Sequence, residues 1–313
     1  MNPGKAPTAA TAGAPVGADA GDGLRPSLAE LLALRAGVAR SAPRRARDGV
    51  HGQAPSPLRG RGMEYAESRE YVPGDDVRRM DWRLTARTGR AHTKLFQAER
   101  ERMSLLVADV SPALFFGTRV RFKSVQAARA GAVAVWSALA AGDRIGALRA
   151  GEPALAPATG LRGAMRVLDA LVRWYAQPPA REPGLDLALE QAQRLLRPGA
   201  RLVVLADPAA AAAVPRQRWS ALARHHQASL VLLQDRLELE PPPRRLALRG
   251  SSRRVELDLG DRQVRARWHQ AFVAPAQVLA QELAGLRWDV RLLCADEDAE
   301  AWLRPAPAGG RQA

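Results

Sequence analysis

From residue 101 onward, short apolar runs alternate with longer amphipathic stretches. The short runs predict buried strands, and the stretches with apolar residues three or four positions apart predict helices. Apolar strands separated by amphipathic helices favour an α/β fold, a mostly parallel sheet with helices on both faces. The predicted strands are 103–109, 144–149, 201–206, 229–234 and 288–295, and the predicted helices are 123–141, 161–176, 185–196, 215–226, 275–286 and 297–303.

The chain before residue 101 follows a different pattern. Ser27, with Glu30 three positions later, forms a capping-box pattern that predicts a helix through Arg40. Between 58 and 100 the charges alternate in sign, and 91–97 alternates like a strand. The pair Pro73-Gly74 predicts a turn there, after which Asp75 or Asp76 caps a helical turn over 77–82.

These patterns predict five segments. Residues 1–26 and 305–313 are low in complexity and predict disordered tails. Residues 27–100 hold the first helix, a linker and the charged segment, and 101–240 hold the sheet. Residues 241–304 form a small C-terminal β/α extension, in which the period-two alternation over 244–268 predicts antiparallel strands.

Composition narrows the class of protein. The chain has 313 residues, 47% of them hydrophobic, which is enough for a sizeable core. Cys294 is the single cysteine, so the chain has no internal disulfide and no cysteine-based metal cluster. The longest uncharged apolar run, Ala130–Ala141, is shorter than the roughly 20 residues of a membrane-spanning helix. The N-terminus has no apolar core typical of a signal peptide, so we expect a cytoplasmic protein without membrane insertion.

The net charge of +15 raises the question of whether the protein binds nucleic acid. Nearly all of the basic residues are arginines, with lysine only at positions 5, 94 and 123, and the charge is dense only in 244–270. Nucleic-acid readers concentrate charge on one face and interleave aromatic residues, whereas this chain is 5% aromatic. We expect no specific nucleic-acid partner. The role of the basic segment 244–267 is left open.

Three stretches resemble the domain of unknown function 58 family, bacterial proteins with a von Willebrand factor A-like domain that are often paired with MoxR-type AAA+ ATPases. The most specific stretch is Gly74 to Trp82, which reads Gly-Asp-Asp-Val-Arg-Arg-Met-Asp-Trp. The other matching residues are Leu106 to Ser111 with Phe116-Gly-Thr and Lys123-Ser, and Gly142 to Gly146 with Leu205-Ala-Asp207. The resemblance covers roughly residues 27 to 303 and implies a Rossmann-like, A-like sheet without established enzyme activity.

The same resemblance implies a metal site at the carboxyl ends of the central strands. Asp109, Ser111 and Asp207 match the positions that hold a Mg²⁺-type ion in A-like domains. Ala113 stands where a second serine is expected, and Leu185 where a threonine is expected. Because Mg²⁺ demands near-octahedral oxygen ligands, we expect a degenerate site, with no cofactor or at most weak Mg²⁺ binding. Without a metal, these residues would serve as caps and an Asx-type turn.

The charged segment 64–87 allows three interpretations. Asp75 and Asp76 could act as general acid and base, although no histidine or nucleophile lies nearby in the sequence. Alternatively, a buried or semi-buried ion-pair network ties the segment to the A-like domain, with Trp82 as its apolar anchor. The third interpretation is a partner-binding surface. Its candidate residues are Asp75, Asp76, Arg79, Asp81, Trp82, Arg87 and Asp186.

The leading hypothesis is a non-enzymatic A-like adaptor that works with a MoxR-type AAA+ ATPase on an unknown client complex. Its expected surface is the rim around Asp109, Ser111, Asp186 and Asp207, together with the loop 74–82. The second hypothesis is a metal-dependent binding protein or hydrolase, and the third is a nucleic-acid-associated protein using Arg244 to Arg267. The element Asp235 to Glu238 resembles the family's Asp-x-x-Glu pattern, and its role is left open.

Overall fold

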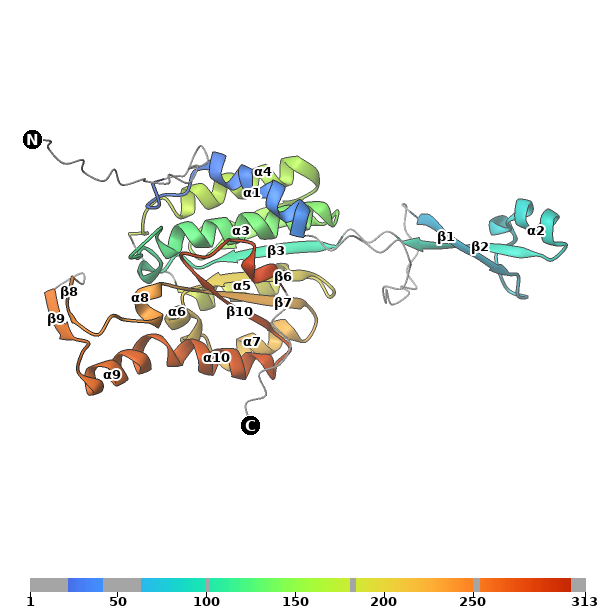
Figure 1. Cartoon of the computed structure of the whole chain (residues 1–313). Coiled ribbons are helices and arrows are strands. Elements are labelled where there is room, and N and C mark those ends of the chain that lie inside the picture. The colour runs from blue at the N-terminus through green and yellow to red at the C-terminus, as the bar shows by residue number, and fades with distance from the viewer. Residues whose placement is uncertain (1–21, 42–62, 99–101, 181–183, 250–253, 305–313) are drawn as a thin grey trace, which may run out of the picture. The chain divides into compact units, whose positions relative to one another are not determined.

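The computed structural model describes residues 22–41, 63–98, 102–180, 184–249 and 254–304. The chain forms two compact units (Figure 1). The larger unit comprises residues 1–42 and 102–313, and the smaller unit comprises residues 43–101.

A six-stranded sheet organises the larger unit, with the strand order β10-β7-β6-β3-β4-β5. All neighbouring pairs are parallel except β4 and β5, which pair antiparallel at one edge. The strands are β3 (Met103–Ala108), β4 (Arg144–Arg149), β5 (Leu155–Ala158), β6 (Arg201–Ala206), β7 (Gln227–Gln234) and β10 (Asp289–Cys294). The predicted mostly parallel sheet is confirmed. Strand β5 was not predicted because it is short and contains Pro157, which weakens a strand pattern.

Helices cover both faces of this sheet, so its apolar strands are buried on both sides (Figure 1). On one face lie α1 (Leu28–Ser41), α3 (Lys123–Ala140) and α4 (Gly160–Trp174). On the other lie α5 (Leu185–Leu195), α6 (Pro208–Ala212), α7 (Arg216–Ala223) and α10 (Ala274–Ala284). The arrangement is compatible with a Rossmann-like fold. None of the helices in the described part of the chain is long and apolar enough to cross a bilayer.

Helix α1 begins where the sequence predicts it, because the backbone N–H of Glu30 donates to Ser27 Oγ at 3.1 Å. The helix packs on α3: Leu31 is fully buried, and the indole N–H of Trp136 donates to the Leu31 carbonyl at 2.9 Å. The sequence analysis grouped this helix with residues 42–100. The structure instead places it in the larger unit.

The C-terminal region departs from prediction in one element. The hairpin β8 (Arg245–Arg249) and β9 (Arg254–Asp258) agrees with the period-two pattern. The strand predicted to continue through 268 is wrong, because α9 (Arg262–Phe272) begins at that point. Asp261 starts the helix by accepting the backbone N–H groups of Gln263 and Val264. Strand β10 belongs to the main sheet, so this region is not a separate extension.

In the smaller unit, β1 (Met63–Glu70) and β2 (His92–Ala98) form an antiparallel hairpin. Between them lie a 3₁₀ turn, η1 (Val77–Arg79), and a helix, α2 (Trp82–Thr88). The predicted helical turn that Asp76 caps is confirmed at Val77, but its predicted extent to Trp82 is wrong: η1 ends at Arg79, and Asp81 caps a new helix. Strand β1 was not predicted, because its sequence Met-Glu-Tyr-Ala-Glu-Ser-Arg-Glu has no regular apolar alternation.

Candidate functional site

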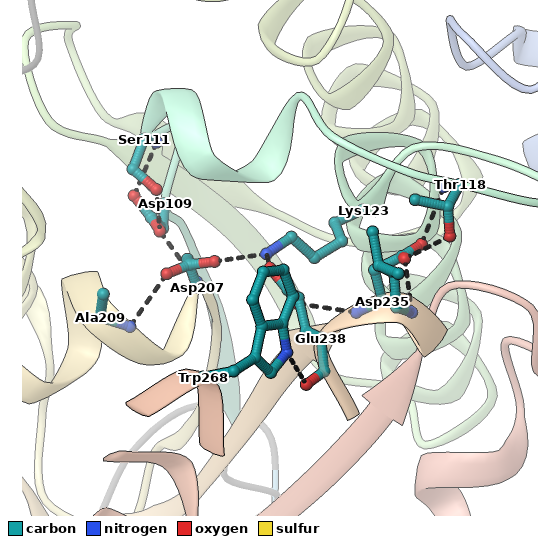
Figure 2. A network of polar contacts seen from close by, with 10 residues as sticks. Asp109, Ser111, Thr118, Lys123, Asp207, Ala209, Asp235, Glu238 and Trp268 are labelled. Atoms are coloured by element: carbon teal, nitrogen blue, oxygen red, sulfur yellow. Dashed lines mark hydrogen bonds and ion pairs between the residues drawn. The ribbon is translucent and has the colours of Figure 1, made fainter. Parts of the chain in front are cut away.

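Two aspartates lie at the carboxyl ends of neighbouring strands in the larger unit. Asp109 follows β3 and Asp207 follows β6, and these strands pair in parallel with Ala108 opposite Leu205. The backbone N–H of Asp207 donates to Asp109 Oδ2 at 3.0 Å, and both side chains are buried (Figure 2). The strand-end pattern therefore brings the two predicted carboxylates together. In open α/β sheets, this edge is where ligands usually bind.

Asp109 is fully engaged in local hydrogen bonds. Ser111 donates to it twice, through its backbone N–H to Oδ1 and through its hydroxyl to Oδ2, both at 2.9 Å. Burial raises the pKa of Asp109 to about 6, although these donors and the Asp207 N–H favour the ionised form. The Ser111 hydroxyl makes no cap to the following 3₁₀ turn, η2 (Pro112–Leu114), and serves the carboxylate instead.

The positions expected to complete a metal site have other roles. Ala113 lies in η2 with its methyl group exposed. Leu185, at the start of α5, is buried in the apolar core beneath the sheet. Its neighbour Asp186 accepts a hydrogen bond from Arg218 Nε at 2.8 Å, which joins α5 to α7. Asp186 is therefore engaged in an ion pair between helices.

Lys123 brings a positive charge into the acidic cluster. Its Nζ lies 2.8 Å from Asp207 Oδ2 and 2.6 Å from Glu238 Oε1, and its side chain is only 1% exposed (Figure 2). Burial lowers the pKa of the ammonium group, but attraction by Asp207 and Glu238 outweighs burial, so the pKa is raised overall. Lys123 is thus a buried cation with two carboxylate partners.

The element Asp235 to Glu238 anchors this cluster from β7. It forms the capping box of the short helix α8 (Arg236–Leu239), in which the Asp235 N–H donates to Glu238 Oε2 at 2.8 Å. Thr118 donates to the Asp235 carboxylate through its backbone N–H and its hydroxyl. The indole N–H of Trp268, from α9, donates to the Glu238 carbonyl at 3.0 Å (Figure 2). The element therefore joins β7, the loop before α3, and α9.

A divalent cation does not suit this set of donors. Mg²⁺ needs close to six oxygen ligands in an octahedron, and two of the expected hydroxyls are replaced by Ala113 and Leu185. The ammonium group of Lys123 is hydrogen-bonded to Asp207, the second acid of the expected site. Across the described residues, no cluster of three or more histidines, cysteines, aspartates or glutamates is arranged to hold a metal. The residues present thus do not fit the ion that the A-like resemblance implies.

In the smaller unit, the predicted acidic residues cap and brace local turns. Asp75 accepts the Val72 N–H at 3.0 Å and Arg69 Nη2 at 2.7 Å. Asp76 accepts the Arg78 N–H, and Asp81 accepts the Leu84 N–H at 3.0 Å. Backbone N–H donors lower the pKa of both Asp75 and Asp81. These carboxylates are therefore hydrogen-bond acceptors that hold the backbone of the segment.

Three large apolar side chains of the same segment are exposed. Trp82 is 66% exposed, and Val72 and Val77 are 53% and 54% exposed. Within the described part of the smaller unit, Trp82 therefore anchors no buried network, and a tie between this segment and the A-like domain stays a prediction. The described ion pairs of the smaller unit are local, namely Arg69 with Asp75 and Arg90 with Glu70.

Sequence reasoning identified Asp109, Ser111 and Asp207 but missed the part played by Lys123. Two signals were available. Lysine is rare in this arginine-rich chain, and this lysine stands directly before an apolar helix, where the positive end of the helix dipole disfavours a cation. A buried lysine at a helix start implies acidic partners, and the capping-box pattern of Asp235 and Glu238 supplied one of them.

The structure defines an α/β protein with a mostly parallel sheet and a buried acidic cluster at its carboxyl edge, in which Lys123 pairs with two carboxylates. The family described as "Protein of unknown function DUF58" matches residues 67–277, more than half of the chain, so the chain belongs to this family.

Two relatives have a similar sequence. They are the uncharacterized proteins Rv1480 of Mycobacterium tuberculosis (strain H37Rv) and Mb1516 of Mycobacterium bovis. Each is 38% identical over 164 residues, which are 51% of this chain and 52% of the relative. The chain thus matches about half the length of these curated relatives.

One solved structure is also similar, that of an aerotolerance-related membrane protein from Bacteroides fragilis carrying multiple mutations to serines. It is 15% identical with a TM-score of 0.38, and the alignment covers 64% of this chain and 95% of that chain. We base no conclusion on so distant a likeness.

Proposed function

We propose that this chain is a cytoplasmic, non-enzymatic adaptor of von Willebrand factor A-like architecture. It presents a protein-binding surface to a MoxR-type AAA+ ATPase that acts in the assembly or maturation of a client complex. The family resemblance of the stretch Gly74 to Trp82 supports the choice of partner. The acidic pair over the ends of β3 and β6 supports the A-like architecture.

The observation that carries the proposal is the exposure of large apolar side chains in the segment 72–87, which we call the docking segment. Val72, Val77 and Trp82 are each more than half exposed within this short stretch. Exposed apolar residues that gather in one place mark sites of protein contact. Tryptophan, in particular, is enriched among the residues that dominate binding energy at interfaces.

The charges around these residues indicate the kind of surface that the partner offers. Asp75 and Asp81 are occupied by backbone N–H groups and by Arg69 and Ser68. The exposed arginines of the docking segment outnumber its one exposed carboxylate, Asp76, which accepts the Arg78 N–H. These arginines are Arg78, Arg83 and Arg87. A partner face with an apolar pocket rimmed by carboxylates complements this surface.

Co-purification tests the proposal. The full chain, tagged and expressed at a near-native level, is expected to retain a MoxR-type ATPase, and the Trp82→Ala variant is expected to lose it. The matched control is Val278→Ala, which truncates an apolar side chain of α10 that is 52% exposed. If the wild-type chain retains no such ATPase, or if both variants retain it equally, the proposal fails.

A specific observation favours a second candidate function, association with nucleic acid. Arg262, Arg265 and Arg267 of α9 are exposed and, within the described ranges, form no ion pair. Basic side chains of this kind bind phosphates with a strong dependence on salt. Retention on a random-sequence DNA column that falls steeply with salt, and that is lost on replacing these arginines with glutamine, would support this function. Passage through the column at low salt would eliminate it.

A further inference from the structure

We infer that the ammonium group of Lys123 takes the place of the divalent ion that balances the acidic cluster in A-like domains with a complete metal site. The carboxyl edge of the sheet is then held together by the chain's own cation. The inference goes beyond the adaptor proposal and does not depend on the identity of any partner.

The first reason is charge balance. Asp109, Asp207 and Glu238 bring three carboxyl groups into a buried region at the ends of β3, β6 and β7. An isolated buried carboxylate is costly unless it is paired with a cation or becomes protonated. Lys123 Nζ lies within 2.8 Å of Asp207 and within 2.6 Å of Glu238, so one cation serves two of the three acids.

The second reason is that the carboxylate oxygens of the cluster already face hydrogen-bond donors. Both oxygens of Asp109 accept from Ser111, and Oδ2 also accepts the Asp207 N–H. Asp207 Oδ1 accepts the Ala209 N–H and its Oδ2 accepts Lys123. The two oxygens of Glu238 accept Lys123 and the Asp235 N–H. A bound divalent ion would have to displace these donors before it gained its ligands.

The third reason is the placement of the lysine itself. Lys123 is the first residue of α3, where the helix dipole disfavours a positive charge. Its side chain is nevertheless as buried as the apolar core. A compact ammonium on a flexible stem can reach both carboxylates, whereas a planar guanidinium requires a wider space. The position is therefore explained by the two acids that it contacts.

The consequence is that three distant segments are fixed without a metal. Lys123 joins the start of α3 to the end of β6 through Asp207, and to the turn after β7 through Glu238 (Figure 2). Thr118 and Trp268 extend this connection to the loop before α3 and to α9. Binding at this edge of the sheet is then independent of divalent ions.

Two measurements test the inference. The first is a titration of the chain with Mn²⁺, in which the paramagnetic signal of the ion reports binding. The second is thermal unfolding of the chain in Mn²⁺ and, separately, in EDTA. The wild-type chain is expected to bind no stoichiometric Mn²⁺ and to keep its Tm within about 1 °C between the two conditions, which corresponds to well under 1 kcal/mol. Binding of one Mn²⁺ per chain, with a rise in Tm that the Asp109→Ala variant loses, would overturn the inference.

Two variants test charge balance directly. Lys123→Met keeps the length of the side chain and removes its charge, so its Tm is expected to fall by about 10 °C. The double variant Lys123→Met with Glu238→Gln removes a charge of each sign and is expected to recover part of this loss. Lys94→Met, at a half-buried lysine of β2, is the control and should leave the Tm of the larger unit unchanged.

A Tm of Lys123→Met equal to that of the wild-type chain would contradict the inference. A double variant less stable than Lys123→Met would also contradict it, because lysine would then act through packing rather than charge. If Lys123→Met does not fold, the Mn²⁺ titration of the wild-type chain still decides the outcome. No partner protein is needed, so failure here leaves the adaptor proposal standing.

Discussion

The carboxyl edge of the sheet and the docking segment 72–87 contain the same kinds of residue but use them differently. At the edge of the sheet, Asp109 and Asp207 are buried, and Lys123 pairs with Asp207 and Glu238. In the docking segment, Asp75 and Asp81 hold exposed turns while Trp82 faces solvent. In this comparison, the acidic motifs mark where the fold is fixed, and the exposed apolar side chains mark where we propose that a partner binds.

The largest effect is expected from Asp207→Ala. This change leaves Lys123 with a single carboxylate partner and removes the acceptor of the Ala209 N–H. Breaking a buried ion pair by removing one partner costs about 3–5 kcal/mol, which urea unfolding would measure. The matched control is Asp186→Ala, which breaks the more exposed pair with Arg218 and should cost less than about 1 kcal/mol. Equal losses for the two variants would contradict the buried, charge-balanced cluster.

A smaller effect is expected from the titration of Asp109. Burial raises its pKa to about 6 in the folded chain, compared with 3.8 as the ordinary value. Because the folded state holds this proton more tightly, the stabilisation is fully present below pH 3.8 and is lost as the pH rises through about 6. Asp109→Asn cannot titrate. The free energy of unfolding of the wild-type chain relative to this variant should therefore fall by about 3 kcal/mol between pH 3.8 and pH 7.

Urea unfolding of both proteins at several pH values measures this difference. A constant difference between them across this range would show that the Asp109 carboxyl group is not perturbed by burial.

In the smaller unit, Asp81→Ala should have a local effect. The side chain caps α2 through the Leu84 N–H and also accepts the Ser68 hydroxyl. Losing an N-cap costs about 1 kcal/mol, which should speed the hydrogen exchange of the α2 amides several-fold. The amides of β3 and β6, in the larger unit, provide the internal control. Unchanged exchange in α2 would refute a structural role for this carboxylate.

The smallest effect on stability is expected from Trp82→Ala. Because the side chain is 66% exposed, its removal should change the free energy of unfolding by no more than about 0.5 kcal/mol. Trp219→Ala is the matched control, since Trp219 is buried in the core of the larger unit and its loss should cost about 3–5 kcal/mol. Chemical denaturation of the two variants compares them. A large loss for Trp82→Ala would mean that this residue serves the fold rather than a partner.

The sequence is sufficient to predict the strands of the parallel sheet, but it does not predict some of the elements outside them. Apolar runs such as 144–149 and 201–206 coincide with β4 and β6, because strands buried on both faces must be apolar throughout. The sequence pattern predicts a strand where α9 lies. The alternation of 255–259 does not indicate that the strand ends before Asp261, which caps a helix. The sequence does not predict strand β1, because a strand of a two-stranded hairpin does not need a regular alternation of apolar residues.

The candidate site was predictable only in part. Residues that follow adjacent parallel strands lie at the same edge of a sheet. This rule predicts that Asp109 and Asp207 lie close together, as they do in the structure. The partners of Lys123 lie 84 and 115 residues further along the chain, and no local pattern links them. The acidic residues at the carboxyl edge of the sheet are buried, whereas the apolar residues of the docking segment are exposed. Residue types alone do not specify this difference in burial.

The most direct test of the account is the affinity of the full chain for the proposed MoxR-type ATPase, measured by titration for the wild type, for Trp82→Ala and for the control variant Val278→Ala. The account predicts at least a tenfold weaker affinity for Trp82→Ala, which is about 1.4 kcal/mol or more, and an unchanged affinity for Val278→Ala. An affinity of Trp82→Ala equal to that of the wild type and of Val278→Ala would contradict it.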